Sequence, residues 1–452
     1  KIADVARLMT GFDSDVVLVR AATGEYVGMM TDADIRQLVI GPVVSADRPV
    51  SEFMTAPLRS VGEHETLAQA VNLMRERGVE HLCVRDSRER ICGTIRKGDV
   101  VNLQHSTSAV LAAAIGESTT VAELRTIYRR LPLYVGALSE SGARTAVITN
   151  AITGTSDAIR RKLEEFVIRE LGTPPAAYAF VALGSEGRCE QTLLTDQDNA
   201  IIYEDAAEDR RPAVEEYFAN YGARMCRLLH ETGFNYCAGE IMASNPRWNK
   251  PMAEWRRYYS GWVREPDPQA LLESAIFFDF RSVCGDPTVV ADLARHVRQL
   301  LTENPAFLPH LAREGINYKT PLGLFGKIQT DAGDGQSPTL NLKSPLRVIV
   351  NLVRLYAMKQ GLRETNTIGR IHGLRQANVF SSSFYRDLLY SYDYLMGLQL
   401  KTQARALRQG KSVTNAVDLA SLSAIELNTL KNVLSQLGTF QSKTRYDFGV
   451  SE

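Results

Sequence analysis

Residues 181–203 constrain the fold more than any other part of the chain, because they set a glycine turn and two aspartates between two apolar runs. The runs at 179–183 and 200–203 are short and bounded by glycine or polar positions, which predicts two buried strands of an α/β sheet. Asp196 and Asp198 precede the second strand, and alternate side chains of an extended segment point the same way. Two carboxylates on one side form a hard oxygen site, which Mg²⁺ occupies together with water and phosphate oxygens.

A candidate phosphate site lies at the end of the first predicted strand, where Gly184 and Ser185 follow directly. A tight turn at this point, next to the start of a helix, would offer backbone N–H groups and a hydroxyl to a phosphate. The sequence therefore predicts a phosphate site beside a metal site. The alternative is a surface loop whose aspartates cap a helix.

The same segment holds Gly-Ser-Glu-Gly-Arg at 184–188, Glu-Gln-Thr at 190–192 and Thr-Asp-Gln-Asp-Asn at 195–199. This order resembles the signature of the bacterial nucleotidyltransferases that carry paired CBS motifs, relatives of the uridylyltransferase that modifies the PII protein of nitrogen signalling. The runs at 242–248 and 276–281 extend the resemblance, which implies a nucleotidyltransferase-superfold mixed sheet with helices. It also implies an enzyme that uses Mg²⁺ (or Mn²⁺) to transfer a nucleoside monophosphate from a nucleoside triphosphate to a hydroxyl acceptor, with release of pyrophosphate.

The resemblance assigns a role to each residue of the motif. Asp196 and Asp198 would be the catalytic, metal-binding carboxylates. Gly184 and Ser185 would hold the β and γ phosphates, and Arg188 would neutralise the negative charge that develops during transfer. These residues leave open whether the acceptor is a protein or a small molecule.

Nucleotidyl transfer usually employs a third carboxylate, which helps to hold the metal or takes the proton of the attacking hydroxyl. Glu240 stands at a suitable place in the chain, within a predicted strand at 235–242. Asp279 is the second catalytic candidate, in an Asp-x-Arg pattern with Arg281. The alternatives are a solvated strand end for Glu240 and a salt bridge to Arg281 for Asp279, and the sequence leaves the choice open.

An internal repeat occupies the start of the chain, where residues 28–35 return in altered form at 93–100. Each copy follows an apolar strand, at 16–19 and 81–84, and precedes a helix-like segment. The pattern resembles a tandem CBS pair over residues 1–105. The first copy is predicted to be truncated, without its opening strand and helix, and the starting lysine predicts a segment missing upstream.

The CBS resemblance implies a site for an adenosine nucleotide. Thr31 and Asp34 fit the positions that hold a ribose in that family. In the second copy Arg96 replaces the hydroxyl residue, where it would contact a phosphate, and Asp99 remains. The alternatives are that the aspartates cap helices and that the pair serves as a dimerisation platform, and we expect a homodimer.

The rest of the chain divides by pattern, so that the predicted fold class is α/β plus all-α. Residues 106–175 read as a helical connector that ends at a Gly-Thr-Pro-Pro break. Residues 176–295 are the predicted nucleotidyltransferase core, and residues 296–452 are a predicted C-terminal helical bundle that binds substrate.

The predicted helix at 346–360 is apolar almost all round, apart from a stripe that includes Arg347 and Arg354. Lys and Arg far outnumber Asp and Glu in 341–411, so buried arginines there need an anionic partner from elsewhere. We expect Arg347, Arg354 and Arg370 to bind the triphosphate or an acidic acceptor. The alternative is that they pair with carboxylates of the core.

Composition excludes several classes of function. Lys plus Arg and Asp plus Glu each number 52 among 452 residues, and this zero net charge argues against a general binder of nucleic acid or anionic membranes. No apolar run reaches the roughly 18 residues of a membrane span. The six cysteines are scattered without a Cys-x-x-Cys pair, which favours reduced thiols and a cytoplasmic location.

The sequence thus predicts a signalling nucleotidyltransferase whose CBS pair senses a nucleotide. Two other classes remain as alternatives. One is a non-catalytic regulator that binds nucleotides, and the other is a scaffold that binds a partner through the CBS pair.

Overall fold

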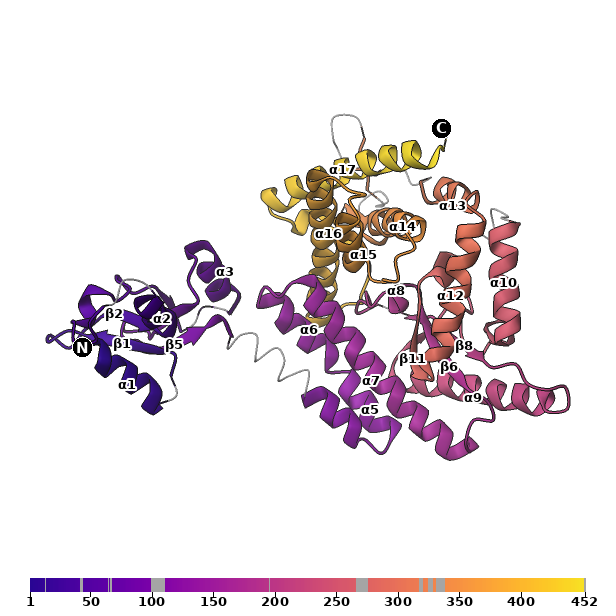
Figure 1. Ribbon diagram of the computed structural model, residues 1–452, viewed down its shortest axis with the longest axis horizontal. Helices are drawn as coiled ribbons and strands as arrows, with labels where there is room; N and C mark the ends of the chain where they lie inside the picture. Colours follow the sequence, from indigo (N-terminus) through magenta and orange to yellow (C-terminus); the bar gives the residue numbers. More distant parts are fainter. Residues whose placement is uncertain are drawn as a thin grey trace. The chain divides into compact units, whose positions relative to one another are not determined.

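The computed structural model describes residues 1–12, 14–40, 44–63, 65, 67–98, 110–194, 196–265, 275–316, 320–323, 328–330 and 338–450. The chain forms two compact units (Figure 1), of which the first comprises residues 1–106 with 140–142 and the second residues 107–139 with 143–452. Among the described helices, none is both long and apolar enough to cross a membrane. The finer boundaries that we predict near residues 175 and 295 stay predictions.

The first unit contains two small sheets with short helices. Strand β1 pairs antiparallel with β2, while β3 runs parallel to β4 and β4 antiparallel to β5. Each copy of the repeat runs from a strand, β2 or β5, into helical residues, as the sequence predicts. The elements in chain order are α1 (Ile2–Phe12), β1 (Val16–Arg20), β2 (Tyr26–Thr31), α2 (Asp32–Ile40), β3 (Ser60–Gly62), α3 (Leu67–Arg77), β4 (His81–Arg85) and β5 (Ile91–Arg96).

The prediction that the first copy lacks its opening helix is wrong, because α1 is present and packs on β1 and α2. Val5 and Met9 lie one turn apart on α1 and are buried with Met30 of β2. The apolar spacing is helical, but the poor helix formers Thr10 and Gly11 follow it and obscure the pattern in the sequence.

The second unit is built on a four-stranded sheet of order β10-β8-β6-β11. Strand β6 is antiparallel to both β8 and β11, and β10 is parallel to β8. The strands are β6 (Tyr178–Leu183), β8 (Asn199–Tyr203), β10 (Asn249–Pro251) and β11 (Phe280–Gly285). A separate parallel ladder joins β7 (Asp196–Gln197) to β9 (Asn235–Tyr236).

Helices cover both faces of this sheet, which explains why β6 is a continuous apolar run. Val181 and Leu183 face a core shared with α10 (Met252–Arg264) and α12 (Pro287–Glu303). Phe180 and Ala182 point the other way, into a core shared with α7 (Thr145–Leu171) and α9 (Arg211–Thr232). The alternation expected of a strand is therefore present with both sides buried.

The connector, the turn after β6 and the C-terminal part supply the remaining helices, most of which are labelled in Figure 1. Residues 110–117 are helical, and further helices are α5 (Val121–Tyr128), α6 (Leu131–Glu140), α8 (Gly184–Gly187), α13 (Phe307–Ile316), α14 (Lys343–Lys359), α15 (Thr367–Gln376), α16 (Ser382–Arg408) and α17 (Ala424–Phe448). One hydrophobic core runs from the sheet through Leu293 of α12 to Val353 of α14 and Leu434 of α17. The fold class is thus α/β plus all-α, as predicted, and the sheet and the bundle share one core.

Two local predictions differ from the structure. The strand predicted at 235–242 is only β9, because a turn follows in which the Glu240 N–H donates to the Cys237 carbonyl and Glu240 adopts a left-handed φ of 54°. The part predicted to be entirely helical also contains a short antiparallel pair, β12 (Thr339–Asn341) with β13 (Ala416–Asp418).

Candidate functional site

A cavity of about 330 Å³ lies in the second unit, between the Gly-Ser turn, the aspartate segment, α14 and α16. Its walls come from segments that are far apart in sequence. Seven of the predicted site residues line it: Gly184, Ser185, Arg188, Asp196, Asp198, Arg347 and Arg354. Glu240, Asp279 and Arg370 are not among the lining residues.

The turn after β6 forms the short helix α8, and its two glycines fit positions where a side chain would not. Gly184 has a φ of +56°, and an added Cβ would lie 2.7 Å from a side-chain carbon of Ile276. A Cβ on Gly187 would lie 2.0 Å from the Asp279 carbonyl oxygen. Close backbone packing therefore fixes this turn at the cavity wall.

Strand alternation places the two motif aspartates on one face. Asp196 is exposed and Asp198 is half-buried, whereas Gln197 between them is fully buried. The Gln197 amide points into the core and donates to the carbonyls of Cys226 and Phe234. Both aspartates line the cavity, as the sequence predicts from their spacing.

The electrostatics of Asp198 fit a site for a cation. Burial raises the pKa of Asp198 to about 6, and the charge of Asp196 acts in the same direction. A hydrogen bond from the Cys237 thiol and the charges of Lys343 and Arg188 partly oppose this rise. A divalent cation between the two carboxylates would favour their ionised form, and oxygen donors are the ligands that Mg²⁺ and Mn²⁺ accept.

Among the described residues, no third carboxylate is grouped with this pair. Within the described ranges, no three His, Cys, Asp or Glu side chains are grouped so that they could hold a metal. Glu240 is exposed on its turn, and Asp279 is fully buried behind the cavity wall. A cation at Asp196 and Asp198 would therefore take further ligands from water and phosphate.

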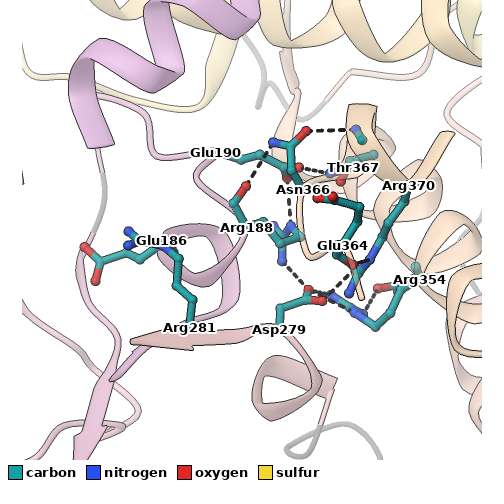
Figure 2. A network of polar contacts seen from close by, with 12 residues as sticks. Glu186, Arg188, Glu190, Asp279, Arg281, Arg354, Glu364, Asn366, Thr367 and Arg370 are labelled. Atoms are coloured by element: carbon teal, nitrogen blue, oxygen red, sulfur yellow. Dashed lines mark hydrogen bonds and ion pairs between the residues drawn. The ribbon is translucent and has the colours of Figure 1, made fainter. Parts of the chain in front are cut away.

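Asp279 is the centre of a buried ion cluster that Figure 2 shows. One carboxylate oxygen accepts from Arg188 Nη1 at 2.8 Å and from Arg354 Nε at 2.9 Å, and the other lies 2.7 Å from Arg370 Nη1. Burial opposes ionisation of Asp279, but Arg354, Arg370 and Arg188 together hold its pKa well below the usual range. This carboxylate orients two guanidinium groups of the cavity wall, Arg188 and Arg354.

A second carboxylate ties the turn to the helical part. Glu190 Oε2 accepts from Arg188 Nε at 2.7 Å, and its Oε1 accepts from the Thr367 N–H at 2.5 Å (Figure 2). The Asn366 amide donates to the Arg188 carbonyl at 3.0 Å. Two carboxylates, Glu190 and Asp279, thus face three guanidinium groups, and the cluster keeps a surplus of positive charge beside the cavity.

The basic residues predicted on the helical part separate into two kinds. Arg354 and Arg370 are buried and pair with Asp279. For these two arginines the structure therefore shows the alternative of the sequence analysis, pairing with a carboxylate of the core. Arg347 is exposed and lines the cavity with Lys343, and within the described part of the chain neither side chain forms an ion pair. Arg347 and Lys343 are therefore available to an anion.

The connector helix α7 reaches the same turn from the opposite side of the sheet. Arg160 of α7 forms a fully buried ion pair with Glu186 of α8, and Gln191 donates to the same carboxylate oxygen at 2.7 Å. Arg281 donates to the Glu186 carbonyl and forms two hydrogen bonds with Asp157 of α7. These contacts were not predicted from the sequence. A signal was present, because Arg160 and Asp157 lie one turn apart on a strongly helical segment.

The sequence analysis also missed the polar and apolar residues that close the cavity, because nothing in their local pattern marks them. They are contributed by the segment before Asp196, by α16 and by the residue that precedes β13. They include Thr192, Met396, Gln399 and Asn415.

In the first unit, a cavity of about 750 Å³ brings together three of the four predicted CBS residues, Thr31, Asp34 and Arg96. The Asp34 carboxylate accepts from both the N–H and the hydroxyl of Thr31 at 2.8 Å, at the start of α2. Arg96 forms an ion pair with Asp15, which also lines the cavity. Asp99 lies outside the described residues.

Comparison with protein families agrees with this architecture. Residues 129–269 match the family described as "Putative nucleotidyltransferase DUF294", and residues 305–448 match its "Putative nucleotidyltransferase substrate binding domain". Residues 50–106 match the CBS domain. The fold and the site thus define a nucleotidyltransferase-type core with a substrate-binding helical domain. The chain thus carries the two domains described as "Putative nucleotidyltransferase DUF294" and its substrate binding domain, together with a CBS domain.

Solved structures similar to this chain align with about a quarter of it. A putative signal-transduction protein with CBS domains from Burkholderia ambifaria is 29% identical, with 22% of this chain and 74% of that chain covered and a TM-score of 0.21. A conserved protein from Pyrococcus horikoshii is 27% identical, with 23% and 76% covered and a TM-score of 0.22. A CBS domain protein from Pyrobaculum aerophilum, complexed with AMP, is 18% identical, with 24% and 85% covered and a TM-score of 0.21. No curated protein matches the chain.

Proposed function

We propose that the second unit is a metal-dependent nucleotidyltransferase. It would transfer a nucleoside monophosphate from a nucleoside triphosphate to a hydroxyl acceptor and release pyrophosphate. The observation that carries the proposal is the meeting of an aspartate pair, a Gly-Ser turn and basic side chains from two parts of the chain at one cavity of about 330 Å³. The free thiols of all six cysteines support a reducing, cytoplasmic location.

Different residues of the cavity would bind different parts of the triphosphate. The Gly184 backbone and the Ser185 hydroxyl hold phosphate oxygens at the turn, and Arg347 and Lys343 neutralise phosphate charge from α14. Arg188 and Arg354, oriented by Asp279, stabilise the negative charge that develops as pyrophosphate leaves. Asp196 and Asp198 would hold Mg²⁺ or Mn²⁺, which would supply charge neutralisation at the phosphates.

The first test removes the carboxylate pair. Asp196→Asn with Asp198→Asn is expected to lower metal-dependent pyrophosphate release by about 100-fold or more, because the oxygens that would hold the cation lose their charge. Release would be measured with each of the four nucleoside triphosphates, Mg²⁺ and cell extract as the source of acceptor. Asp209→Asn is the matched control, because Asp209 is exposed and outside the cavity. Equal release by the double variant and the wild type would exclude the proposed site.

A non-catalytic regulator is the second candidate, and the absence of a third carboxylate near Asp196 and Asp198 within the described residues favours it. Such a protein would bind the triphosphate at the same cavity without turnover. Calorimetric binding that depends on Arg347, together with no pyrophosphate release in the presence of extract, would decide for the regulator.

We further propose that an adenosine nucleotide binds the cavity of the first unit and regulates the enzyme. Thr31→Ala with Asp34→Ala is expected to weaken this binding about tenfold or more, because it removes the hydroxyl and the carboxylate that face the ribose. Calorimetry with AMP and ATP on the full chain would measure the change. Thr23→Ala with Glu25→Ala is the matched control, because both residues are exposed in the β1–β2 turn. Unchanged affinity in the Thr31/Asp34 variant would move the nucleotide site elsewhere.

A further inference from the structure

A chain of side-chain amides borders the cavity, and its orientation is set by the backbone. Gln403 of α16 is fully buried, and its Oε1 accepts from the Leu193 N–H at 3.0 Å. A backbone N–H can only donate, so this bond identifies which end of the Gln403 amide is the oxygen. The Nε2 group of Gln403 then donates to Asn415 Oδ1 at 3.1 Å.

The same logic fixes the next two amides. Because Asn415 Oδ1 accepts from Gln403, the group of Gln399 that lies 2.6 Å from this oxygen is the donor Nε2. Two polar atoms are left over, the acceptor Gln399 Oε1 and the donor Asn415 Nδ2. Within the described part of the chain neither atom has a hydrogen-bond partner, and both residues line the cavity.

These two atoms lie in a cavity whose lining also includes apolar side chains. Gln399 is 5% exposed, so its amide is shielded from bulk solvent. Met396 lies one turn before Gln399 on α16, and Leu346 and Val350 line the cavity from one face of α14. An apolar wall with one donor and one acceptor matches a nucleobase, which proteins hold by apolar contact on its faces and hydrogen bonds along its edge.

We propose that Gln399 and Asn415 read the hydrogen-bonding edge of the nucleobase and so determine which nucleoside triphosphate the enzyme takes. The inference rests on the proposed function, because it assigns the base end of the same triphosphate site. Gln399 Oε1 accepts from an amino or imino group of the base, and Asn415 Nδ2 donates to the adjacent acceptor. Adenine and cytosine place an exocyclic amino donor beside a ring acceptor, whereas guanine and uracil place a ring imino donor beside a carbonyl acceptor. A base with the wrong placement leaves the amide groups unsatisfied in the cavity.

The test compares nucleotide with a probe that has no base. Binding of the four nucleoside triphosphates and of inorganic tripolyphosphate to the full chain would be measured by calorimetry with Mg²⁺. Gln399→Met keeps the length of the side chain and removes the acceptor, and Asn415→Asp keeps Oδ1 and removes the donor. Each variant is expected to lower the affinity ratio of the preferred nucleotide to tripolyphosphate about tenfold. Gln409→Met, at the exposed end of α16, is the matched control and should leave the ratio unchanged.

The possible negative results distinguish failure of this inference from failure of the proposed function. An unchanged ratio in both variants would mean that the amides only support the loop before Asp196, and equal wild-type binding of all five probes would mean that no base is read. Either result overturns this inference and leaves the phosphate site in place. Binding of none of the probes to the wild type would reject the proposed function, and this inference with it.

Discussion

Asp279→Asn is expected to lower the free energy of unfolding of the second unit by about 3–5 kcal/mol. The substitution keeps the shape of the side chain but removes a carboxylate that Arg188, Arg354 and Arg370 share. Arg354 and Arg370 are almost completely buried, so their charges would be left without their counter-ion in a medium of low polarity. Urea unfolding at neutral pH, followed by tryptophan fluorescence, would measure the loss.

The pH dependence gives this prediction a second check. Arginine stays charged at all accessible pH values, and the folded-state pKa of Asp279 lies well below its ordinary value of 3.8. The stabilisation is therefore fully present above pH values of about 4 to 5 and is lost as the pH falls below that range. Asp292→Asn, which breaks an exposed pair with Arg295, is the control and should change stability by less than about 1 kcal/mol. A loss of that small size for Asp279→Asn would show that the cluster is not held by charge.

Arg160→Met is expected to have the second large effect, again about 3–5 kcal/mol of unfolding free energy at pH 8. Arg160 and Glu186 are both completely shielded from solvent, so removal of the guanidinium leaves a buried carboxylate without its counter-ion. Adding Glu186→Met to the first substitution should recover most of the loss, since an apolar pair avoids the cost of desolvation. A double-mutant cycle from urea unfolding would measure the coupling, with Arg161→Met, an exposed neighbour on α7, as the control.

This pair also predicts how stability changes with pH. Burial raises the folded-state pKa of Glu186 from 4.5 to about 7, although Arg160 opposes the rise. Between these values the folded state holds a proton that the unfolded state has released, so raising the pH lowers stability in that window. Without Arg160 the folded-state pKa rises further, and the loss of stability should continue above pH 7. A variant whose stability is independent of pH between 7 and 9 would contradict this account.

Local periodicity predicted which side chains share a face of a strand or helix. It could not predict which side chains from distant segments form ion pairs. The spacing of Asp196 and Asp198 sufficed to place both on one face, because a strand alternates with a period of two. Pairing of the buried arginines with core carboxylates was one of two alternatives, but the particular partners could not be identified, since Arg188 and Asp279 are 91 residues apart in the chain. The same holds for Arg160 and Glu186, which are 26 residues apart and come from different elements.

The Asp-x-Arg pattern singled out Asp279 but did not determine its role. The pattern was compatible with a carboxylate at the metal and with a salt bridge to Arg281. The structure shows a different pairing, because Arg281 forms an ion pair with Asp157, and Asp279 forms ion pairs with three other arginines. Which side chain meets which is decided by the packing of α7, α14 and α15 around the sheet, and no single segment contains that information.

The hydrophobic core that the sheet shares with α14 and α17 has a consequence for how ligands are captured. Two lobes joined by a hinge would close around a nucleotide after it arrives, and part of the binding energy would be consumed in bringing them together. Here Leu293 and Val353 belong to one apolar cluster, so the walls on either side of the cavity are set when the chain folds. The proposed binding surface is therefore preorganised, and we expect differences in affinity between nucleotides to report the fit of each base and phosphate rather than the cost of closing a cleft.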